Sequence, residues 1–342
     1  IKLSSMNVLK VIGCSMALCV LPLSGQTGGG TELFRDMKAP QHERIMDLLS
    51  RLTVEEKISL LVNDAPAIGR LGIDKYNHGN EALHGVVRPG DFTVFPQAIG
   101  MAAMWNPELL YRISSAISDE ARGRWKELEY GKKQIAGASD LLTFWSPTVN
   151  MARDPRWGRG QETWGEDPYL TTRMGVAVVR GMQGPADAKY DKTHACAKHY
   201  AVHSGPEAKR HSFDVENLEP RDLWETYLPA FKALVQEADV KEVMCAYQRF
   251  EGEPCCGSNR LLTQILRDEW GYKHLVVSDC GAISDFFYQG RHETHPDAAT
   301  SSASAVINGT DLECGVEYAH LDEAVERGSV SYTHLTLPTT ER

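Results

Sequence analysis

The chain has 342 residues, of which 42% are hydrophobic, 24% charged and 8% aromatic. This composition excludes disordered, collagen-like and coiled-coil classes, and the length suffices for one large barrel of about 250 residues or two ordinary domains. The formal net charge is −10, from 36 basic and 46 acidic residues. Such a balance gives no electrostatic reason to expect a nucleic-acid partner, and a small neutral substrate fits better.

The first 30 residues have the pattern of a signal peptide. Lys10 precedes an apolar run over residues 11–23, and small, flexible residues follow it up to Gly30. The run is shorter than the roughly 20 residues of a membrane-spanning helix, and no later segment is comparably apolar. We therefore expect residues 1–30 to direct export to a periplasmic or extracellular location, with no membrane span in the mature protein.

Apolar residues then recur at helical spacing in several segments, each with a local start or stop signal. Thr53 and Glu56 can form a capping box, in which each side chain accepts from the other residue's backbone N–H. A proline that follows an asparagine or an aspartate marks two further helix starts. The segments expected to be helical are residues 44–52, a segment after Thr53, segments from Asn106 and from Asp167, residues 220–234, a segment from Asn259 to Gly271, and residues 321–328.

Short, apolar, strand-like runs lie between these helices. Continuous hydrophobicity predicts strands buried on both faces, and their alternation with amphipathic helices predicts parallel βα units, in a closed barrel or in a doubly wound sheet. Polar clusters follow nearly every run, as expected when several βα loops converge on one face of a barrel, and no GxGxxG turn is present. The sequence therefore predicts an α/β fold with a TIM-like (β/α)8 barrel. The predicted strands are residues 73–76, 144–151, 195–202, 243–247 and 275–278.

No internal repeat and no low-complexity linker divides the chain. We therefore expect residues 31–330 to form one domain. Residues 331–342 abandon the alternation of helices and strands, and we predict that this tail is not a native continuation.

Cysteine and histidine spacing indicates no metal site. Six of the eight cysteines follow the predicted leader, and no CxxC pair occurs. Export would allow one or two disulfides that spacing cannot assign, and buried free thiols are an equal alternative. His199 and His203 are four residues apart without an HExxH glutamate, so we expect packed histidines, no metal and no cofactor.

Asp279 stands at the end of the most apolar strand, residues 275–278. An aspartate held there can attack an anomeric carbon, while a second carboxyl group acts as acid and then as base in retaining glycoside hydrolysis. The ordinary alternative is an aspartate that caps the next helix. Polar clusters after other strands favour the catalytic role.

Three such clusters stand out. Lys198 and His199 are cationic or donor groups that could hold sugar hydroxyls and keep a nearby carboxylate ionised, although Lys198 could instead be a Schiff-base amine of an aldolase. Residues 150–168 contain three arginines, two tryptophans and four acids, which suit sugar binding by guanidinium groups and indole faces or a salt-bridged loop brace. Glu81, in residues 80–85, can accept from two sugar hydroxyls, although alone it would be a surface residue.

In this order, the clusters NEALHG, RDPRWGRGQETWGEDP, AKHY and VVSDC resemble glycoside hydrolase family 3, over roughly residues 40–330. The resemblance implies a distorted or complete (β/α)8 barrel and retention of configuration. It also implies Asp279 as the nucleophile, and a sugar site formed by Glu81, Arg159, Lys198, His199, Met244 and Tyr247.

Two positions resemble the xylosidase and arabinofuranosidase branch of that family. Many β-glucosidases of the family have tryptophan after the nucleophile and aspartate at the position of Glu81, whereas this chain has Cys280 and Glu81. The longer acid fills space that a hexose hydroxymethyl group would need. The resemblance therefore implies an exo-acting β-xylosidase for oligosaccharides or aryl glycosides, with a β-glucosidase as the alternative.

The resemblance also implies a general acid/base residue in a second α/β domain, which we expect to be missing from this chain. No residue here is assigned to that role. General acid catalysis contributes about 10² to 10⁴ in rate, so natural substrates with poor leaving groups would be nearly inert. A barrel that only binds sugar is therefore a further alternative.

Overall fold

The computed structural model describes residues 32–130, 141–331 and 334. The predicted leader and most of the predicted tail lie outside these residues. Contacts divide the chain into two compact units, residues 1–48 and residues 49–342. Among the described helices, none combines the length and apolar character that a membrane crossing requires.

The described part of the first unit contains η1 (Leu33–Arg35) and the beginning of α1 (Gln41–Arg51), which confirms the first predicted helix with an earlier start. Two side chains of α1 hold η1 by hydrogen bonds to its backbone. Asp47 Oδ2 accepts from the Phe34 N–H at 2.9 Å, and Arg44 Nε donates to the Phe34 carbonyl at 3.0 Å.

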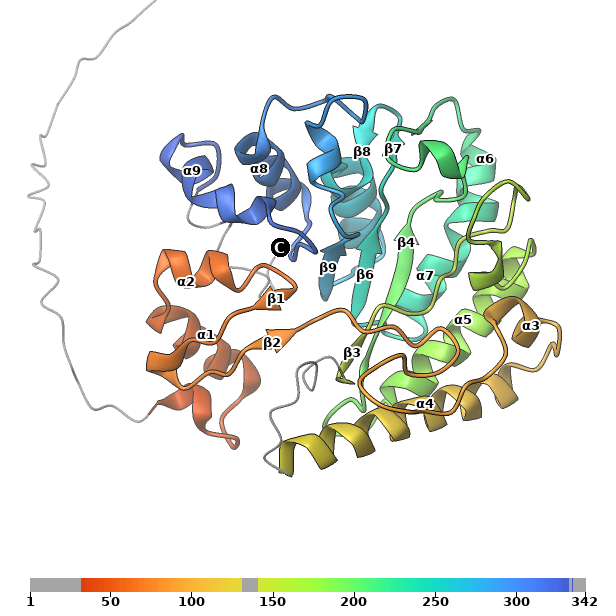
Figure 1. Ribbon diagram of the computed structural model, residues 1–342, viewed down its shortest axis with the longest axis horizontal. Coiled ribbons are helices and arrows are strands. Elements are labelled where there is room, and N and C mark those ends of the chain that lie inside the picture. Colours follow the sequence, from red (N-terminus) through yellow and green to blue (C-terminus); the bar gives the residue numbers. More distant parts are fainter. Residues whose placement is uncertain (1–31, 131–140, 332–333, 335–342) are drawn as a thin grey trace, which may run out of the picture. The chain divides into compact units, whose positions relative to one another are not determined.

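A curled parallel sheet forms the centre of the second unit (Figure 1). Its order is β3-β4-β6-β9, and all neighbours run parallel. The four strands are β3 (Thr143–Phe144), β4 (His194–Tyr200), β6 (Glu242–Cys245) and β9 (Leu275–Ser278). The strands predicted at residues 195–202, 243–247 and 275–278 are confirmed as β4, β6 and β9, with small shifts in their bounds.

The prediction of a continuous strand over residues 144–151 is wrong, because regular pairing ends at Phe144. Pro147 lacks an N–H group and cannot donate to a ladder. The segment nevertheless follows β4, since the Val149 N–H donates to the Lys198 carbonyl at 2.8 Å. It therefore carries residues 150–168 to the same end of the sheet as the end of β4.

Single parallel bridges extend the sheet beyond both of its edges. Asn80 pairs with β3, Leu312 pairs with β9, and Glu313 pairs with Val62. Between Val62 and Asn80, the chain forms an antiparallel pair of β1 (Asp64–Ala65) and β2 (Tyr76–Asn77). The strand predicted at residues 73–76 is therefore wrong in its bounds and direction, since only Tyr76 belongs to β2. A smaller sheet contains β5 (Asp214–Val215), β7 (Arg249–Phe250) and β8 (Glu253–Pro254).

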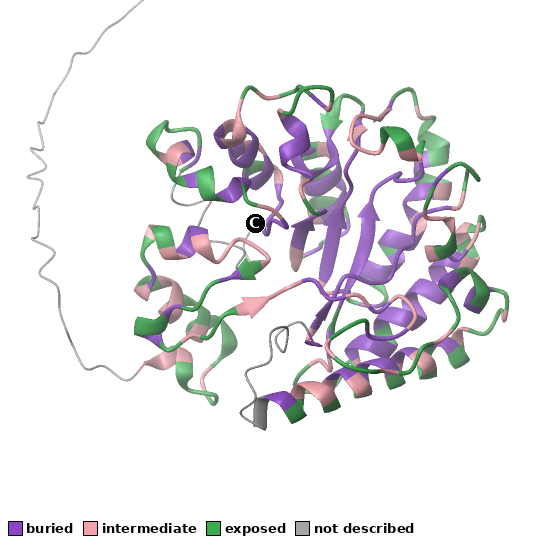
Figure 2. Ribbon diagram, viewed as in Figure 1, coloured by how far each residue is buried: buried purple, intermediate pink, exposed green. Residues whose placement is uncertain are grey.

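Helices surround the sheet, and Figure 2 shows buried strands beside helices that are buried on one side and exposed on the other. The longer ones are α2 (Val54–Ser59), α4 (Pro107–Tyr130), α5 (Pro168–Gln183), α7 (Pro229–Gln236), η8 (Asn259–Glu269), α8 (Ala298–Asn308) and α9 (Leu321–Glu326). The short ones are η2 (Gly69–Leu71), α3 (Ala98–Ala102), η4 (Gly160–Glu162), η5 (Glu207–Lys209), α6 (Pro220–Asp222), η6 (Leu223–Tyr227), η7 (Cys255–Gly257), η9 (Ser284–Phe286) and η10 (Glu317–His320).

The predicted helix starts are confirmed where the capping residue is local. Thr53 and Glu56 form the capping box, with N–H to side-chain oxygen distances of 2.9 and 3.2 Å. Asn106 Oδ1 accepts from the backbone N–H three residues on at 2.9 Å, and Asp167 Oδ1 does the same at 2.6 Å. These contacts satisfy N–H groups of the first helical turn, which have no hydrogen-bond partner within the helix.

Two helix predictions are wrong in detail. Residues 220–234 do not form one helix, because Pro229 cannot donate a helical hydrogen bond, and the π-helical η6 separates α6 from α7. The helix predicted from Asn259 is capped by Ser258, whose Oγ accepts from the Leu261 N–H at 3.3 Å. Asn259 is its first residue.

The hydrophobic core consists of two clusters on opposite faces of the sheet. The larger one packs strand side chains such as Val243 and Val276 with the helices. The smaller one lies on the other face and contains Trp145, Cys196, Met244, Val277, Leu312 and Cys314. Since side chains alternate along a strand, Lys198 shares the face of Cys196 and Met244.

Two buried acids, Glu313 and Glu317, contact one another beside this smaller cluster. Glu313 Oε2 accepts from the Tyr318 N–H at 2.6 Å, and a Cβ on Gly315 would lie 2.5 Å from Glu313 Oε1. Burial raises the pKa of Glu313 to about 9, and the Glu317 carboxylate contributes in the same direction. The Glu313 carboxyl group is therefore protonated at neutral pH.

This pair predicts a pH-dependent stability. The folded-state pKa of Glu313 lies above its usual value of 4.5, so its stabilising contribution is complete below about pH 4.5 and declines as pH rises towards 9. Glu313→Gln, a neutral isostere, should flatten that decline, and the Tm difference between wild type and variant should change by about 5 °C or more between pH 5 and 9. Thermal unfolding followed by circular dichroism measures it. Parallel Tm curves for the two proteins would contradict the assignment.

Candidate active site

Asp279 follows β9 directly, and its backbone N–H donates to the Cys245 carbonyl at 3.2 Å. The side chain is buried, and its Oδ1 accepts from the Cys280 N–H at 2.8 Å. It does not cap a helix, since η9 begins only at Ser284. The helix-cap alternative is therefore wrong, and the carboxyl group stands at the carboxyl end of the parallel sheet.

The other oxygen of Asp279, Oδ2, is buried without a hydrogen-bond partner. Burial raises the pKa of this carboxyl group, while the charges of Lys198 and Arg159 act against that increase. The nearby Tyr247 hydroxyl also favours the ionised form, but its single proton is directed to the Cys280 carbonyl at 3.0 Å. Oδ2 therefore has no hydrogen-bond partner, and in the ionised form of Asp279 it is the oxygen that can act as a nucleophile.

Lys198 and Glu81 form a partly buried ion pair beside Asp279. Lys198 Nζ lies 2.6 Å from Glu81 Oε1, and Ser146 Oγ donates to Glu81 Oε2 at 3.2 Å. Lys198 is only 2% exposed, whereas a third of the Glu81 side chain is accessible. The Schiff-base alternative requires an unpaired amine, and the Glu81 carboxylate already engages this one.

A bulge in β4 explains why two consecutive residues reach the site. The register with β6 shifts between Lys198 and Tyr200, so that His199 is the extra residue in the strand. A bulge changes the direction in which a side chain points. His199 Nε2 thus lies 3.6 Å from Asp279 Oδ2, which is too long for a hydrogen bond.

Arg159 is held by a fork of two bonds to Glu162. Its Nε and Nη2 donate to the Glu162 oxygens at 2.8 and 2.7 Å, and Thr148 Oγ1 donates to the same carboxylate at 3.2 Å. Burial acts to raise the pKa of Glu162, but the Arg159 guanidinium holds it below its usual value. The remaining Arg159 nitrogen, Nη1, lies 3.0 Å from His199 Nε2.

The other side chains of residues 150–168 do not form a sugar platform. Trp157 and Trp164 are buried, at 5% and 1% exposed, so the suggestion that they stack on a sugar is wrong. Arg156 pairs with Asp154 on the surface. The loop-brace alternative therefore describes these residues, and Arg159 alone among the three arginines contacts the predicted site.

Met244 and Tyr247 lie on or just after β6. Met244 is 1% exposed in the smaller core cluster, in register with Lys198 and Val277, so it packs beneath the site. Burial raises the pKa of Tyr247, and the negative charge of Asp279 adds to this. The Tyr247 hydroxyl thus stays protonated and braces the residue that follows Asp279.

Among the cysteines that the structure describes, Cys245–Cys256 and Cys280–Cys314 form disulfides, while Cys196 and Cys255 are buried free thiols. The second disulfide joins the residue after Asp279 to the segment that extends the sheet. The Gly281 N–H also donates to the Cys314 carbonyl, at 2.7 Å. A disulfide and a hydrogen bond therefore hold the two residues that follow Asp279 in the chain, and with them the position of Asp279.

Similarity to known proteins identifies the family of the chain. The family model described as "Glycosyl hydrolase family 3 N terminal domain" matches residues 56–339. The chain belongs to glycoside hydrolase family 3. It is 53% identical over 93% of its length to a xylan 1,4-beta-xylosidase of Xylanibacter ruminicola, and 36% identical over 97% to a beta-xylosidase/alpha-L-arabinofuranosidase of Medicago sativa.

Among solved structures, a family 3 exo-beta-xylosidase in complex with a xylobiose aziridine activity-based probe superposes with a TM-score of 0.79, at 32% identity over 90% of this chain. The chain spans 36% and 44% of the two relatives and 40% of that solved chain. It therefore corresponds to less than half of the length of these proteins.

Sequence reasoning missed a third set of residues in this family 3 chain. His211 Nδ1 lies 2.7 Å from Asp285 Oδ2, Arg291 pairs with the other oxygen, and the His211 ring meets the Tyr247 ring edge-on at 4.5 Å. Asp285 is fully buried, but its two partners are partly exposed. His211, Asp285 and Arg291 belong to none of the sequence motifs. Only the contact of His211 with Tyr247 connects them with the site.

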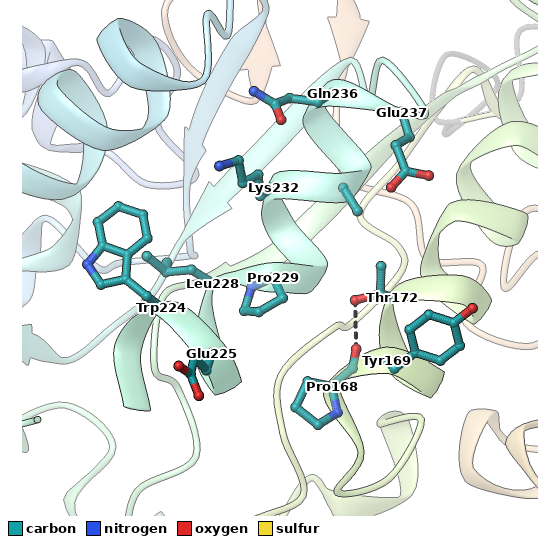
Figure 3. Close-up of a pocket in the computed structure, with 11 residues that line it drawn as sticks. Pro168, Tyr169, Thr172, Trp224, Glu225, Leu228, Pro229, Lys232, Gln236 and Glu237 are labelled. Atoms are coloured by element: carbon teal, nitrogen blue, oxygen red, sulfur yellow. Dashed lines mark hydrogen bonds between the residues drawn. The ribbon is translucent and has the colours of Figure 1, made fainter. Parts of the chain in front are cut away.

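A separate cavity of about 540 Å³ lies between α5 and the η6–α7 segment (Figure 3). Tyr169 and Thr172 line it from α5, while Trp224 and Lys232 line it from the other side. None of its lining residues belongs to the predicted site. Within the described residues, no group of three or more histidine, cysteine or acidic side chains is placed to hold a metal ion.

Proposed function

We propose that the protein is a retaining, exo-acting β-glycosidase, specifically a xylan 1,4-β-xylosidase that removes xylose from the non-reducing ends of oligosaccharides. The observation that carries this proposal is the free Oδ2 of Asp279, buried at a strand end beside the Lys198–Glu81 pair and Arg159. The names of the similar xylosidases support it.

In the proposed reaction, Asp279 Oδ2 attacks the anomeric carbon while the bond from that carbon to the leaving oxygen breaks. The leaving oxygen receives a proton, and water then cleaves the glycosyl ester, which restores the Asp279 carboxylate with retained configuration. Lys198 and Arg159 stabilise the carboxylate before attack and after ester cleavage. Glu81, with a third of its side chain accessible, accepts hydrogen bonds from sugar hydroxyls.

The proton donor is not assigned to a described residue. Glu81 and Glu162 are both paired with cations, so they suit acceptance rather than donation of a proton. We propose that the donor belongs to the second α/β domain that the family resemblance implies. We further propose that residues 31–330 form one TIM-like barrel, distorted or complete, which the bridges from Val62 to Glu313 and from Asn80 to β3 support, and that the protein is exported.

The proposed preference for a pentose rests on the walls of the site. Glu81 is longer than aspartate, and the Cys280–Cys314 disulfide occupies the position next to Asp279. We propose that the longer acid leaves less space for the hydroxymethyl group of a hexose, and that Cys280 supports a pentose through its resemblance to the xylosidase branch. The double name of the Medicago sativa relative supports α-L-arabinofuranosidase as a second activity.

A trapping experiment tests the function and the sugar together. The full chain is incubated with 2-deoxy-2-fluoro xyloside and glucoside that carry the same activated leaving group, so that no proton donor is needed. We expect mass spectrometry to detect a fluoroxylosyl adduct on the peptide that contains Asp279, formed about tenfold or more faster than the glucosyl adduct. An adduct on another residue, or faster glucosyl labelling, would contradict the nucleophile or the sugar assignment respectively.

A further inference from the structure

The Asn150 side chain holds both the backbone and the ring of His199. The His199 N–H donates to Asn150 Oδ1 at 2.9 Å, and Asn150 Nδ2 donates to the His199 carbonyl at 2.9 Å. One of these backbone groups is a donor and the other an acceptor. A flipped amide would place Nδ2 against the His199 N–H and Oδ1 against the His199 carbonyl oxygen, and neither pair can form a hydrogen bond. The orientation of the Asn150 amide is therefore determined by the backbone.

This orientation determines the proton on the first ring nitrogen. Asn150 Oδ1 lies 3.0 Å from His199 Nδ1. An amide oxygen only accepts hydrogen bonds, so Nδ1 must carry a proton.

Arg159 determines the state of the second ring nitrogen. Its Nη1 lies 3.0 Å from His199 Nε2, and a guanidinium group has donors but no acceptor. Nε2 must therefore present its lone pair, and a second proton there would face the Arg159 N–H. The ring is thus neutral and carries its proton on Nδ1.

The surroundings of the ring agree with this state. The charged and titratable groups that face it are Asp279, Arg159, Lys198, Arg210 and His203. Burial lowers the pKa of His199 well below its usual value, and the positive charge of Arg159 lowers it further. Asp279 alone among these groups favours an imidazolium, and its Oδ2 stands 3.6 Å away.

We propose that Asn150 is a positioning residue that keeps His199 in the neutral Nδ1–H form, so that the ring donates no hydrogen bond to Asp279 Oδ2. A donor at Nε2 would share the electron pair that attacks the sugar and would lower the reactivity of the carboxylate. The tautomer follows from the contacts alone, whereas its effect on reactivity rests on the proposed function of Asp279. In this proposal, His199 Nε2 is an acceptor rather than the cationic or donor group that the sequence suggested.

A neighbouring pair offers a matched control. Gln248 Oε1 lies 2.8 Å from His203 Nδ1, and Gln248 Nε2 donates to the Ala201 carbonyl. Gln248 and Asn150 are both nearly fully buried. The change from amide to acid at Gln248 thus introduces the same charge at similar depth, but against a different histidine.

The test combines nitrogen NMR of the histidine rings with trapping of Asp279 in the full chain. In the wild type, we expect His199 to keep a protonated Nδ1 and a bare Nε2 over about pH 5 to 8. Asn150→Asp places a negative charge against Nδ1 and should bring a second proton onto Nε2 within that range. Labelling by the activated 2-deoxy-2-fluoro xyloside should slow by about tenfold, with its acidic limb moved to higher pH. Gln248→Glu should change the signals of His203 and leave the tautomer of His199 unchanged.

Each outcome decides a separate point. A wild-type His199 with Nε2 protonated would overturn the proposal without recourse to any variant, even if Asn150→Asp failed to fold. A variant that acquires the second proton but labels at the wild-type rate would overturn the positioning role. A wild type with the expected tautomer but no adduct on Asp279 would refute the proposed function instead.

Discussion

Replacement of Asp279 by alanine should reduce the turnover of an activated aryl xyloside by about 10⁴-fold or more, because the attacking atom is removed. The loss should be in kcat as well as in kcat/KM. Azide can occupy the vacated space and attack the anomeric carbon, so its addition should restore the release of the aryl group and yield a xylosyl azide of inverted configuration. Absorbance of the released phenol and NMR of the product measure the two effects.

A matched control is Asp154→Ala. Asp154 lies in the densest polar segment of the sequence but pairs with Arg156 on the surface, so we expect turnover close to that of the wild type. Retention of activity in Asp279→Ala without azide would show that another residue is the nucleophile.

Lys198→Met should reduce kcat/KM by about 10² to 10³-fold, the range found when one charge-stabilising donor is removed from an active site. Burial raises the pKa of Asp279, and the Lys198 charge partly reverses that increase. Without that charge, the pKa rises further, and a smaller fraction of Asp279 is ionised at a given pH. The acidic limb of the kcat/KM profile should therefore move to higher pH.

The same substitution at Lys192 is the control. Lys192 pairs with Asp119 and donates to Ser115, away from the predicted site residues. Lys192→Met should leave the pH profile unchanged. A Lys198→Met profile with the wild-type acidic limb would mean that Lys198 does not act on the charge of Asp279.

Short-range features of the fold followed from the sequence. The capping box at Thr53 and the helix starts at Asn106 and Asp167 all depend on neighbours within a few residues. Two of the failed predictions involve a proline that changed the hydrogen bonding of an otherwise regular pattern. Pro147 ended a predicted strand, and Pro229 divided a predicted helix.

The sequence by itself determined which polar clusters follow strands, and hence that Glu81, Arg159, Lys198, His199 and Asp279 could meet. Their roles were decided only by the tertiary structure, because the decisive contacts join residues far apart in the chain. Lys198 is 117 residues from Glu81, and Asn150 is 49 residues from His199. Only such contacts show that one arginine of three reaches the site, that both tryptophans are buried, and that the His199 proton lies on Nδ1. Composition and spacing carry no information on the direction of a hydrogen bond. In the structure, the contacts of His199 with the Asn150 amide and the Arg159 guanidinium group allow one arrangement of donors and acceptors around the ring.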